Sequence, residues 1–130
     1  MGVGYLWDTN TVIYYLQQQF SPAGEKFIDE VLSESRPNIS SITEIELLCW
    51  KTTTEKDVEV LHGFIHECNV IELEQAVKVM TADLRKKHKI KLPDAIIAAT
   101  ALVYEFTLIT NNEKDFSNIQ GLRIINPGRI

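Results

Sequence analysis

Residues 93–110 read PDAIIAATALVYEFTLIT, and this stretch decides the fold class. Pro93 favours the start of a helix, and the apolar residues that follow have the spacing of a helix that packs on a sheet. The short apolar run at 107–110 then predicts a buried strand. A helix that leads directly into such a strand is the repeating unit of an α/β protein.

The same alternation continues in both directions along the chain. Five short runs predict strands, at 3–7, 38–40, 70–73, 107–110 and 122–125. Six segments have helical patterns, at 11–18, 22–33, 41–51, 55–67, 75–88 and 94–104. This order predicts an α/β fold with a central, mostly parallel five-stranded sheet and helices on both faces. No repeat or linker divides the 130 residues, so we expect a single domain at 1–130.

The composition is that of a globular protein. Hydrophobic residues make up 45% of the chain and charged residues 24%, which excludes a disordered tail or a low-complexity scaffold. No apolar run approaches the roughly 18 residues that span a bilayer, and the first ten residues lack the features of a signal peptide. We therefore expect a cytoplasmic protein, in which Cys49 and Cys68 are two small buried hydrophobic residues.

Charge is spread unevenly along the chain. The net charge of −5 argues against a general nucleic-acid coat protein. Five of the 13 basic residues nevertheless fall within seven positions: Arg85, Lys86, Lys87, Lys89 and Lys91. Such a patch can hold a nucleic-acid backbone. It is equally explained as a basic helix end that complements the helix dipole.

Polar side chains follow two of the predicted strands. Asp8 comes directly after the first strand, and three more residues follow the strand that ends at Thr110, namely Asn111, Asn112 and Asp115. Parallel sheets bind ligands at the carboxyl ends of their strands. Asp94 lies in the first turn of its helix, where the dipole alone favours an acid by roughly 0.3–1 kcal/mol. Taken singly, Asp8 is also explained as a turn residue.

Two glutamates on one predicted helix have different explanations. Ser41 and Glu44 have the spacing of a capping box, in which Ser41 caps the helix and Glu44 bonds back to its backbone. Glu46 has no such role, and it lies on or beside an apolar stripe formed by Ile42, Cys49 and Trp50. A carboxylate that faces a core is costly unless it is paired or binds a cation.

Convergence of Asp8, Glu46 and Asp94 at one edge of the sheet would place three carboxylates in a small volume. Each pair at about 4 Å repels by about 4 kcal/mol at an effective dielectric constant of 20. Protonation or a bound divalent cation relieves this repulsion. An all-oxygen ligand set favours Mg²⁺ or Mn²⁺. Such ions commonly act on phosphates, because they polarise a phosphoryl oxygen and help to form hydroxide.

Four short motifs occur in a fixed order along the chain. They are DTN at 8–10, ISSITEIEL at 39–47, LPDA at 92–95 and TNNEKDF at 110–116. Through them the chain resembles the PIN-domain ribonucleases over nearly its whole length, and most of all the VapC toxins of type II toxin–antitoxin pairs. The resemblance implies a three-layer α/β/α PIN fold and an endoribonuclease that depends on Mg²⁺ or Mn²⁺. It also implies a homodimer and a VapB-like antitoxin that occupies the active-site groove.

Carried over position by position, the resemblance makes Asp8 and Asp94 metal ligands. Glu46, the acid immediately before Leu47, binds the metal or orients a metal-bound water. Asp115 is expected to position the attacking water or a second ion, with Asn112 as the alternative at this fourth corner. Side chains expected to hydrogen-bond the ligands or a metal-bound water are Thr9, Asn10, Thr110 and Asn112. The basic run from Arg85 to Lys91 leads into Asp94 and is expected to hold the RNA backbone.

Three further sequence features each have a competing functional interpretation, which the residues disfavour. The motif at 8–10 also resembles haloacid-dehalogenase-like phosphatases, but Asn10 stands where that chemistry needs a second Asp. His62 and His66 are spaced as a metal pair, yet the glutamate of a zinc protease motif is missing, which favours a structural role. Aromatic residues interpreted as core or interface, rather than as a base-stacking platform, are Tyr14, Tyr15 and Phe20.

Two functional alternatives keep the same fold. One is a PIN-like binding module that has weak or no catalytic activity, against which the complete acid set argues. The other is an RNA-processing nuclease outside a toxin–antitoxin pair, against which the short chain without a further domain argues. Metal binding without RNA cleavage would identify the first, and a short partner that blocks activity would exclude the second.

Overall fold

Five strands form one parallel sheet at the centre of the molecule. The computed structural model describes residues 4–51 and 54–130. The strands are β1 (Tyr5–Trp7), β2 (Asn38–Ser40), β3 (Asn69–Ile71), β4 (Thr107–Ile109) and β5 (Ile124–Ile125). Their spatial order is β3-β2-β1-β4-β5, and each of the four pairings is parallel. The predicted parallel five-stranded sheet is therefore confirmed, with β1 at its centre.

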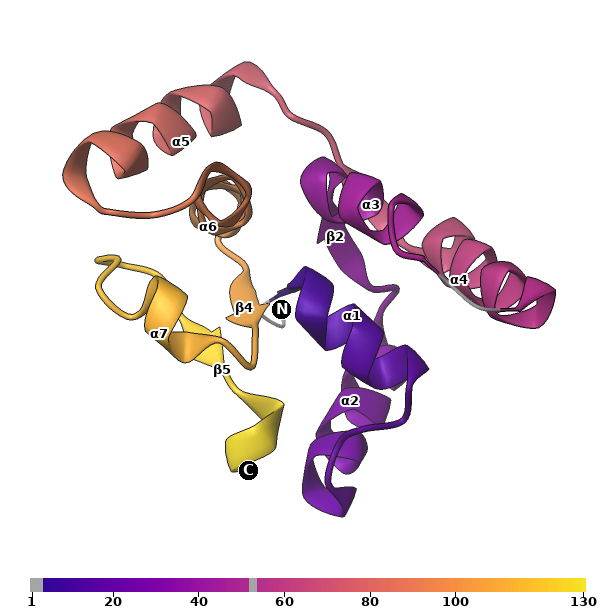
Figure 1. Cartoon of the computed structure of the whole chain (residues 1–130). Helices are drawn as coiled ribbons and strands as arrows, with labels where there is room; N and C mark the ends of the chain where they lie inside the picture. The colour runs from indigo at the N-terminus through magenta and orange to yellow at the C-terminus, as the bar shows by residue number, and fades with distance from the viewer. Residues whose placement is uncertain (1–3, 52–53) are drawn as a thin grey trace.

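Helices cover both faces of this sheet, which gives the expected three layers (Figure 1). Along the chain they are α1 (Thr9–Leu16), α2 (Pro22–Glu34), α3 (Ser41–Leu48), α4 (Glu55–Glu67), α5 (Gln75–Lys87), α6 (Leu92–Tyr104) and α7 (Glu113–Phe116). A 3₁₀ turn, η1 (Pro127–Arg129), ends the chain. In Figure 1, α5, α6 and α7 lie on one side of the strands and α1, α2 and α4 on the other. None of the helices in the described ranges is long and apolar enough to cross a membrane.

Strand alternation divides the apolar core into two halves. Leu6 and Leu108 point into the half beneath α5, α6 and α7, whereas Trp7 and Ile109 point into the half beneath α1, α2 and α4. Successive side chains of a strand face opposite sides of a sheet, so neighbouring residues serve both cores. Helix α6 carries an unbroken run of buried residues at 95–101, which confirms that the stretch at 93–110 packs on the sheet.

Several element boundaries differ from the predicted ones. Helix α1 begins at Thr9 rather than 11, because Asp8 already has the extended backbone of a residue that precedes a helix. The outer strands β3 and β5 are shorter than expected, and Val3, predicted to open the first strand, lies outside the described residues. The sequence analysis missed α7 and η1, since three or four residues are too few to show a helical period.

The helix cap of α3 is also one residue earlier than predicted. Ser40, not Ser41, precedes the helix, and its hydroxyl accepts a hydrogen bond from the Thr43 backbone N–H at 3.1 Å. The capping box of Ser41 and Glu44 is therefore wrong, because β2 runs directly into α3 and its last residue serves as the cap. Glu44 is half-buried on α3 without that structural role.

The two cysteines have different environments. Cys68 is buried in the core, as predicted, and burial raises the pKa of its thiol to about 12. Cys49, predicted to be buried, is exposed just after the end of α3. The error follows from the amphipathic character of α3, in which Leu47 faces the core while Leu48 and Cys49 face outward.

Candidate metal centre and nucleic-acid surface

Asp8 lies at the carboxyl end of the central strand and is 4% exposed. Its backbone N–H donates to the Ile109 carbonyl oxygen at 3.1 Å. The Thr110 hydroxyl donates to Asp8 Oδ2 at 2.7 Å. The ends of β1 and β4 thus fix this carboxylate between them. Asp8 precedes α1, but its side chain does not cap that helix, so the turn-residue interpretation does not account for its burial.

The pKa of Asp8 reports its surroundings. Burial is the largest cause that raises this pKa, from 3.8 to about 6. The Thr110 hydroxyl and the Thr9 backbone N–H lower it by stabilising the charged form. The negative charges of Asp94 and Glu46 raise it further. Asp8 is therefore close enough to Asp94 and Glu46 to feel their negative charge, as expected if the three carboxylates share one site.

Asp94 contributes a second carboxylate from the first turn of α6. It is half-buried, and burial is again the largest cause that raises its pKa. The charges of Asp115 and Glu46 raise the pKa as well, while Lys91 lowers it. Asp94 thus has acidic neighbours on α3 and α7. We call Asp8, Glu46, Asp94 and Asp115 the acid cluster.

A chain of hydroxyl groups holds Glu46 in place. The Thr9 hydroxyl donates to Glu46 Oε1 at 2.6 Å, and its oxygen lies 3.0 Å from the Thr43 hydroxyl oxygen. Because Thr9 gives its only hydroxyl proton to Glu46, Thr43 donates to Thr9 in the second bond. Ser40 donates to Thr43 at 3.3 Å. The chain from Ser40 through two threonines therefore ties α1 and α3 together and directs a donor at the carboxylate.

The other predicted site residues lie at the edge of the cluster. Asp115 and Asn112 are both exposed, on α7 and just before it. The Asn112 backbone N–H donates to the Thr110 hydroxyl at 3.0 Å, and so helps to orient the group that bonds Asp8. Asn10 is exposed, and its side chain makes no hydrogen bond with the described part of the chain. The structure therefore brings Thr9 and Thr110 onto the carboxylates, but not Asn10.

The donor set suits a hard cation, although the side chains are not closed around one. Within residues 4–51 and 54–130, no three His, Cys, Asp or Glu side chains lie close enough to enclose a metal ion. The acid cluster supplies oxygen ligands only, which is the preference of Mg²⁺ and Mn²⁺. Asp8 is buried beside two more carboxylates and has no cationic partner among the causes that set its pKa. The chemistry of this oxygen-only donor set therefore fits a divalent cation, with Asp8 as its most buried carboxylate.

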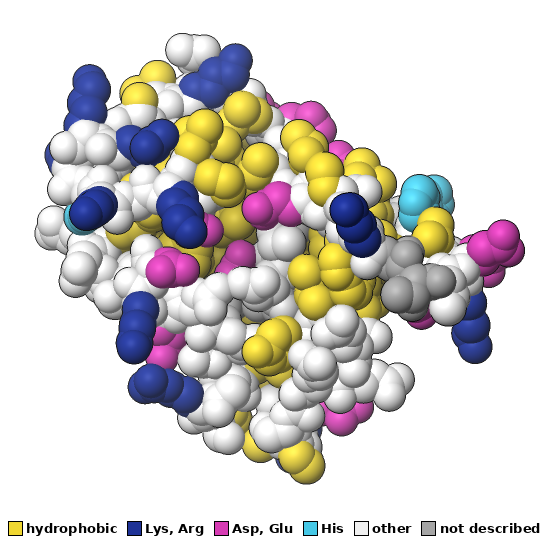
Figure 2. All heavy atoms as spheres, viewed as in Figure 1, with side chains coloured by type: hydrophobic (Ala, Val, Ile, Leu, Met, Phe, Trp, Pro, Cys, Tyr) yellow, Lys and Arg dark blue, Asp and Glu magenta, His cyan; other side chains and the backbone are white. Residues whose placement is uncertain are grey.

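The predicted basic patch divides into two parts. Lys89 and Lys91 line a depression of about 260 Å³ together with Asp94 and Asp115. Arg85, Lys86 and Lys87 lie in the last turn of α5 instead, where Lys87 pairs with Asp83 at 3.1 Å on an exposed surface. Figure 2 shows acidic side chains near the middle of this face, with Lys and Arg side chains spread to the left of them and others to the right.

Three residues with a role at the candidate site were not predicted from the sequence. Lys114 lines the same depression as Lys89 and Lys91, and its place between Asn112 and Asp115 was an available signal. Ser40 and Thr43 support Glu46 through hydroxyl bonds to another helix. No sequence spacing indicates that contact, because Thr9 and Thr43 are 34 positions apart. His62 and His66 are both exposed on α4, and among the described residues they belong to no group of three side chains that could hold a metal ion.

The fold and the acid cluster together define a class of protein. Residues 5–122 match the PIN domain family, and the chain belongs to that family. The assignment confirms the resemblance to PIN-domain ribonucleases and replaces the phosphatase interpretation of the motif at 8–10.

Proteins similar to this chain include VapC proteins. The chain is 30% identical to the tRNA(fMet)-specific endonuclease VapC of Salmonella typhimurium, over 92% of its own length and 95% of the relative's. It superposes on a chain of the DNA-bound VapBC complex from Salmonella typhimurium with a TM-score of 0.80, 28% identity and coverage of 97% and 99%. A toxin–antitoxin complex from Klebsiella pneumoniae gives a TM-score of 0.74 at 30% identity, with coverage of 95% and 98%.

Proposed function

We propose that this protein is a VapC-type endoribonuclease that hydrolyses RNA phosphodiester bonds at the acid cluster with bound Mg²⁺ or Mn²⁺. One observation carries the proposal: the buried Asp8 carboxylate lies at the carboxyl end of the central strand, beside Glu46 and Asp94. The named activity of the VapC relatives supports it. A cation held there would polarise a phosphoryl oxygen and lower the pKa of a bound water.

The residues of the chain prepare this site before any ligand binds. Thr110 directs a hydroxyl proton at Asp8, and Thr9 directs one at Glu46. Donors of this kind hold carboxylates in one orientation, so that less reorganisation is needed on binding. Asp8 and Asp94 are the proposed metal ligands, with Glu46 as a third ligand or as the group that orients the attacking water. Asp115, at the exposed edge, orients that water or helps to hold a second ion.

The lysine-lined depression beside Asp94 is the proposed contact for the RNA backbone. Lys89, Lys91 and Lys114 line the same depression as Asp94 and Asp115. Lysine ammonium groups attract phosphates and release counterions on binding. In a chain of net charge −5, such a local group of cations brings a polyanion to the carboxylates that would otherwise repel it.

Regulation by a partner protein belongs to the same proposal. The structural relatives are toxin–antitoxin complexes, and we infer a VapB-like antitoxin that covers the active-site groove of a VapC-like homodimer. Exposed apolar side chains on α3, namely Ile45 and Leu48, are each 54% exposed, and an apolar surface of this kind favours a protein partner. We expect the protein to act in the cytoplasm, as a single domain over 1–130.

The test is cleavage of a structured RNA pool by the purified chain in Mg²⁺ or Mn²⁺, beside the Asp94→Asn variant. We expect cleavage that EDTA abolishes and that Asp94→Asn lacks, with the fold unchanged, because asparagine is tolerated in a first helical turn. Equal activity in both samples would contradict the proposal and indicate a contaminating nuclease. Metal binding without cleavage would instead favour a catalytically weak binding module.

The toxin assignment has its own test. Co-expression with a short partner encoded as its antitoxin should abolish cleavage by the purified complex and restore growth of the host. Cleavage that no such partner blocks would favour an RNA-processing nuclease outside a toxin–antitoxin pair.

A further inference from the structure

A pocket lies next to the acid cluster, between the end of α1, the loop after β4 and the C-terminal turn η1. Its volume is about 360 Å³, which falls in the range of small-ligand sites, roughly 300–1,000 Å³. Tyr14, Phe20, Asn111, Asn126 and Arg129 are among its lining residues, and no carboxylate is. We call it the C-terminal pocket.

Asn111 is the unusual residue of this pocket. Its side-chain Nδ2 and Oδ1 atoms are both buried, and neither has a hydrogen-bond partner within the described residues. Buried amide groups are nearly always paired, so this donor and acceptor indicate a missing partner. Gly128 of η1 lies over the amide: a Cβ atom built there would be 4.0 Å from Asn111 Oδ1.

Two aromatic rings form one wall of the pocket. The Tyr14 and Phe20 rings have centroids 6.0 Å apart, and Tyr14 is 39% exposed. From the sequence, these two rings and Tyr15 are all expected in the core or at an interface. Tyr15 packs edge-on against the buried Trp7, at 5.7 Å, and Phe20 also packs against the core cluster that contains Trp7. Tyr14 and Phe20 both line the pocket. An exposed ring beside a carboxamide is a common surface for a stacked nucleobase.

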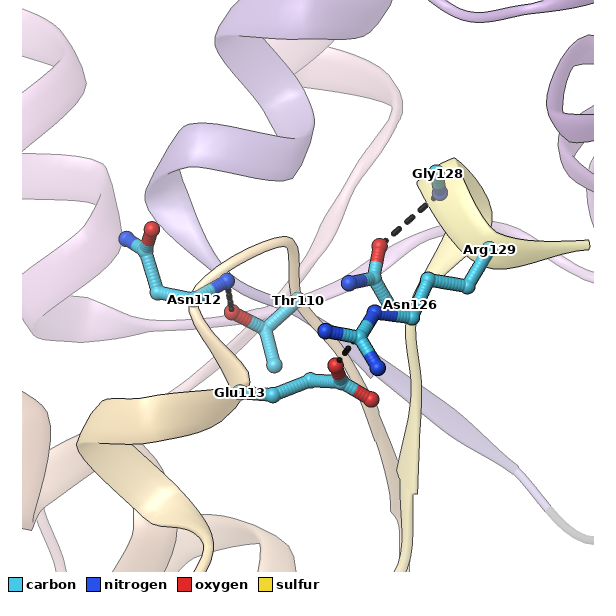
Figure 3. Close-up of polar contacts among 6 residues, drawn as sticks. All are labelled: Thr110, Asn112, Glu113, Asn126, Gly128 and Arg129. Atoms are coloured by element: carbon cyan, nitrogen blue, oxygen red, sulfur yellow. Dashed lines mark hydrogen bonds and ion pairs between the residues drawn. The ribbon is translucent and has the colours of Figure 1, made fainter.

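The rim of the pocket is held by polar contacts (Figure 3). Asn126 Oδ1 accepts a hydrogen bond from the Gly128 backbone N–H at 2.8 Å, which fixes the turn. Arg129 Nε lies 3.0 Å from Glu113 Oε2, and this ion pair joins the turn to α7. The guanidinium thus stands at the rim of the pocket, with its remaining N–H groups available to an incoming phosphate.

We propose that the C-terminal pocket binds a nucleobase of the RNA, on a nucleotide that neighbours the bond to be cut. This inference rests on the proposed ribonuclease function. Thr110 donates to Asp8, and Asn111 is the next residue, so the pocket begins where the acid cluster ends. A carboxamide pairs its donor and acceptor with adjacent groups on a base edge, while Tyr14 stacks on the ring. The pocket thereby selects which base flanks the cleavage site.

The direct experiment is a titration followed by NMR, which needs no catalysis. The ¹⁵N-labelled full chain is titrated separately with AMP, GMP, CMP, UMP and ribose 5-phosphate. We expect saturable shifts of the Asn111 side-chain NH₂ and the Gly128 backbone signal with at least one nucleotide, whereas ribose 5-phosphate should shift the Arg129 signal alone. Equal shifts with ribose 5-phosphate, or shifts confined to Lys89, Lys91 and Lys114, would overturn the proposal. The absence of any shift would also overturn the proposal, because the Asn111 side-chain amide would then bind no nucleotide.

Two variants and a control complete the test. Asn111→Leu should abolish the saturable shifts and change the distribution of bases beside the cut sites in a sequenced RNA digest. Tyr14→Ala, at an exposed ring, should weaken nucleotide binding at least about threefold, by loss of stacking. Gln120→Leu also replaces an amide by leucine, in the exposed turn before β5. It should alter neither nucleotide binding nor the base preference beside the cut sites. Unchanged base preference in Asn111→Leu would overturn the proposal.

Cleavage measured in parallel separates the two hypotheses. Cleavage by the parent chain without nucleotide-specific shifts rejects the pocket and keeps the ribonuclease. Nucleotide-specific shifts without cleavage by the parent reject the proposed activity and keep a nucleotide-binding pocket.

Discussion

The two ends of the acid cluster are built in opposite ways. Asp8 is 4% exposed, lies at the end of the central strand and accepts a hydroxyl proton from Thr110. Asp115 is exposed on a helix of four residues, and its side chain accepts no hydrogen bond from the described residues. One carboxylate is held by the core of the fold, whereas the other lies on the surface without a side-chain hydrogen bond from the described residues.

The contrast indicates where the site gains its precision. A buried carboxylate between two strands is held rigidly, which suits a group that anchors a cation. An exposed carboxylate on a short helix adapts its position, which suits a group that touches water or a second ion. The following predictions test this division, in order of decreasing effect.

Asp8→Asn should have the largest effect on activity. We expect cleavage to fall by at least about 100-fold, since loss of groups that merely support metal ligands already costs 10–100-fold. The same change should stabilise the metal-free fold at pH 7, because it removes a buried charge. Initial cleavage rates and urea unfolding of both proteins measure the two effects. A stable variant that keeps full activity would contradict the assignment of Asp8.

The pH dependence of unfolding follows from the same residue. The folded pKa of Asp8 is about 6, above its ordinary value of 3.8, so the folded state holds this proton more tightly. Its contribution to stability is present below pH 3.8 and is lost as the pH rises through about 6, at most about 3 kcal/mol. Urea unfolding between pH 4 and 7 should therefore show a flatter pH dependence in Asp8→Asn than in the parent. Parallel curves would contradict the burial of this charge.

The glutamate pair on α3 provides a matched comparison. Glu46→Gln should reduce cleavage by about 100-fold, the upper end of the range for groups around a metal. Glu44→Gln, two positions away, should change the rate less than twofold. The difference rests on the hydrogen bond from Thr9 to Glu46, since Glu44 takes part in no capping box. Greater damage from Glu44→Gln than from Glu46→Gln would reverse the assignment.

Thr110→Val preserves the shape of the side chain and removes the donor to Asp8. We expect metal affinity to fall by about tenfold, because the Asp8 carboxylate loses its fixed orientation and becomes easier to protonate. Mn²⁺ titration at constant pH measures this affinity. Serine at the same position should restore it, since Ser keeps the hydroxyl, and failure of that rescue would point to packing instead.

Among the changes within the acid cluster, Asp115→Asn should have the smallest effect, a reduction in cleavage of about three- to tenfold. The exposed carboxylate is replaced by water more easily than the buried one. A loss as large as that of Asp8→Asn would show that the two ends of the cluster are equally important, against the division drawn above.

The sequence predicted the sheet and six of the helices because each buried strand and amphipathic helix has its own local period. The two shortest helical segments, α7 and η1, have none. The cap at Ser40 was missed because strand and helix abut there, and a capping serine at 40 or 41 fits the local sequence equally well.

The candidate site was predictable where a motif supplied it and hidden where distant segments meet. Asp8 and Asp94 follow a strand and open a helix, which are positions visible in the sequence. The hydroxyl chain to Glu46 depends on α1 packing beside α3, over 34 positions. Lys89 and Lys91 are separated from Arg85 because α5 ends before them. The C-terminal pocket depends on the turn η1, which no local sequence pattern predicts.

Calorimetric titration of Mn²⁺ into the parent chain, Asp94→Asn and Glu44→Gln tests the central claim most directly. If the acid cluster is the metal site, the parent and Glu44→Gln bind Mn²⁺ with the same affinity, and Asp94→Asn binds at least about tenfold more weakly. Equal affinities in the parent and in Asp94→Asn would contradict the account, because the metal would then lie elsewhere.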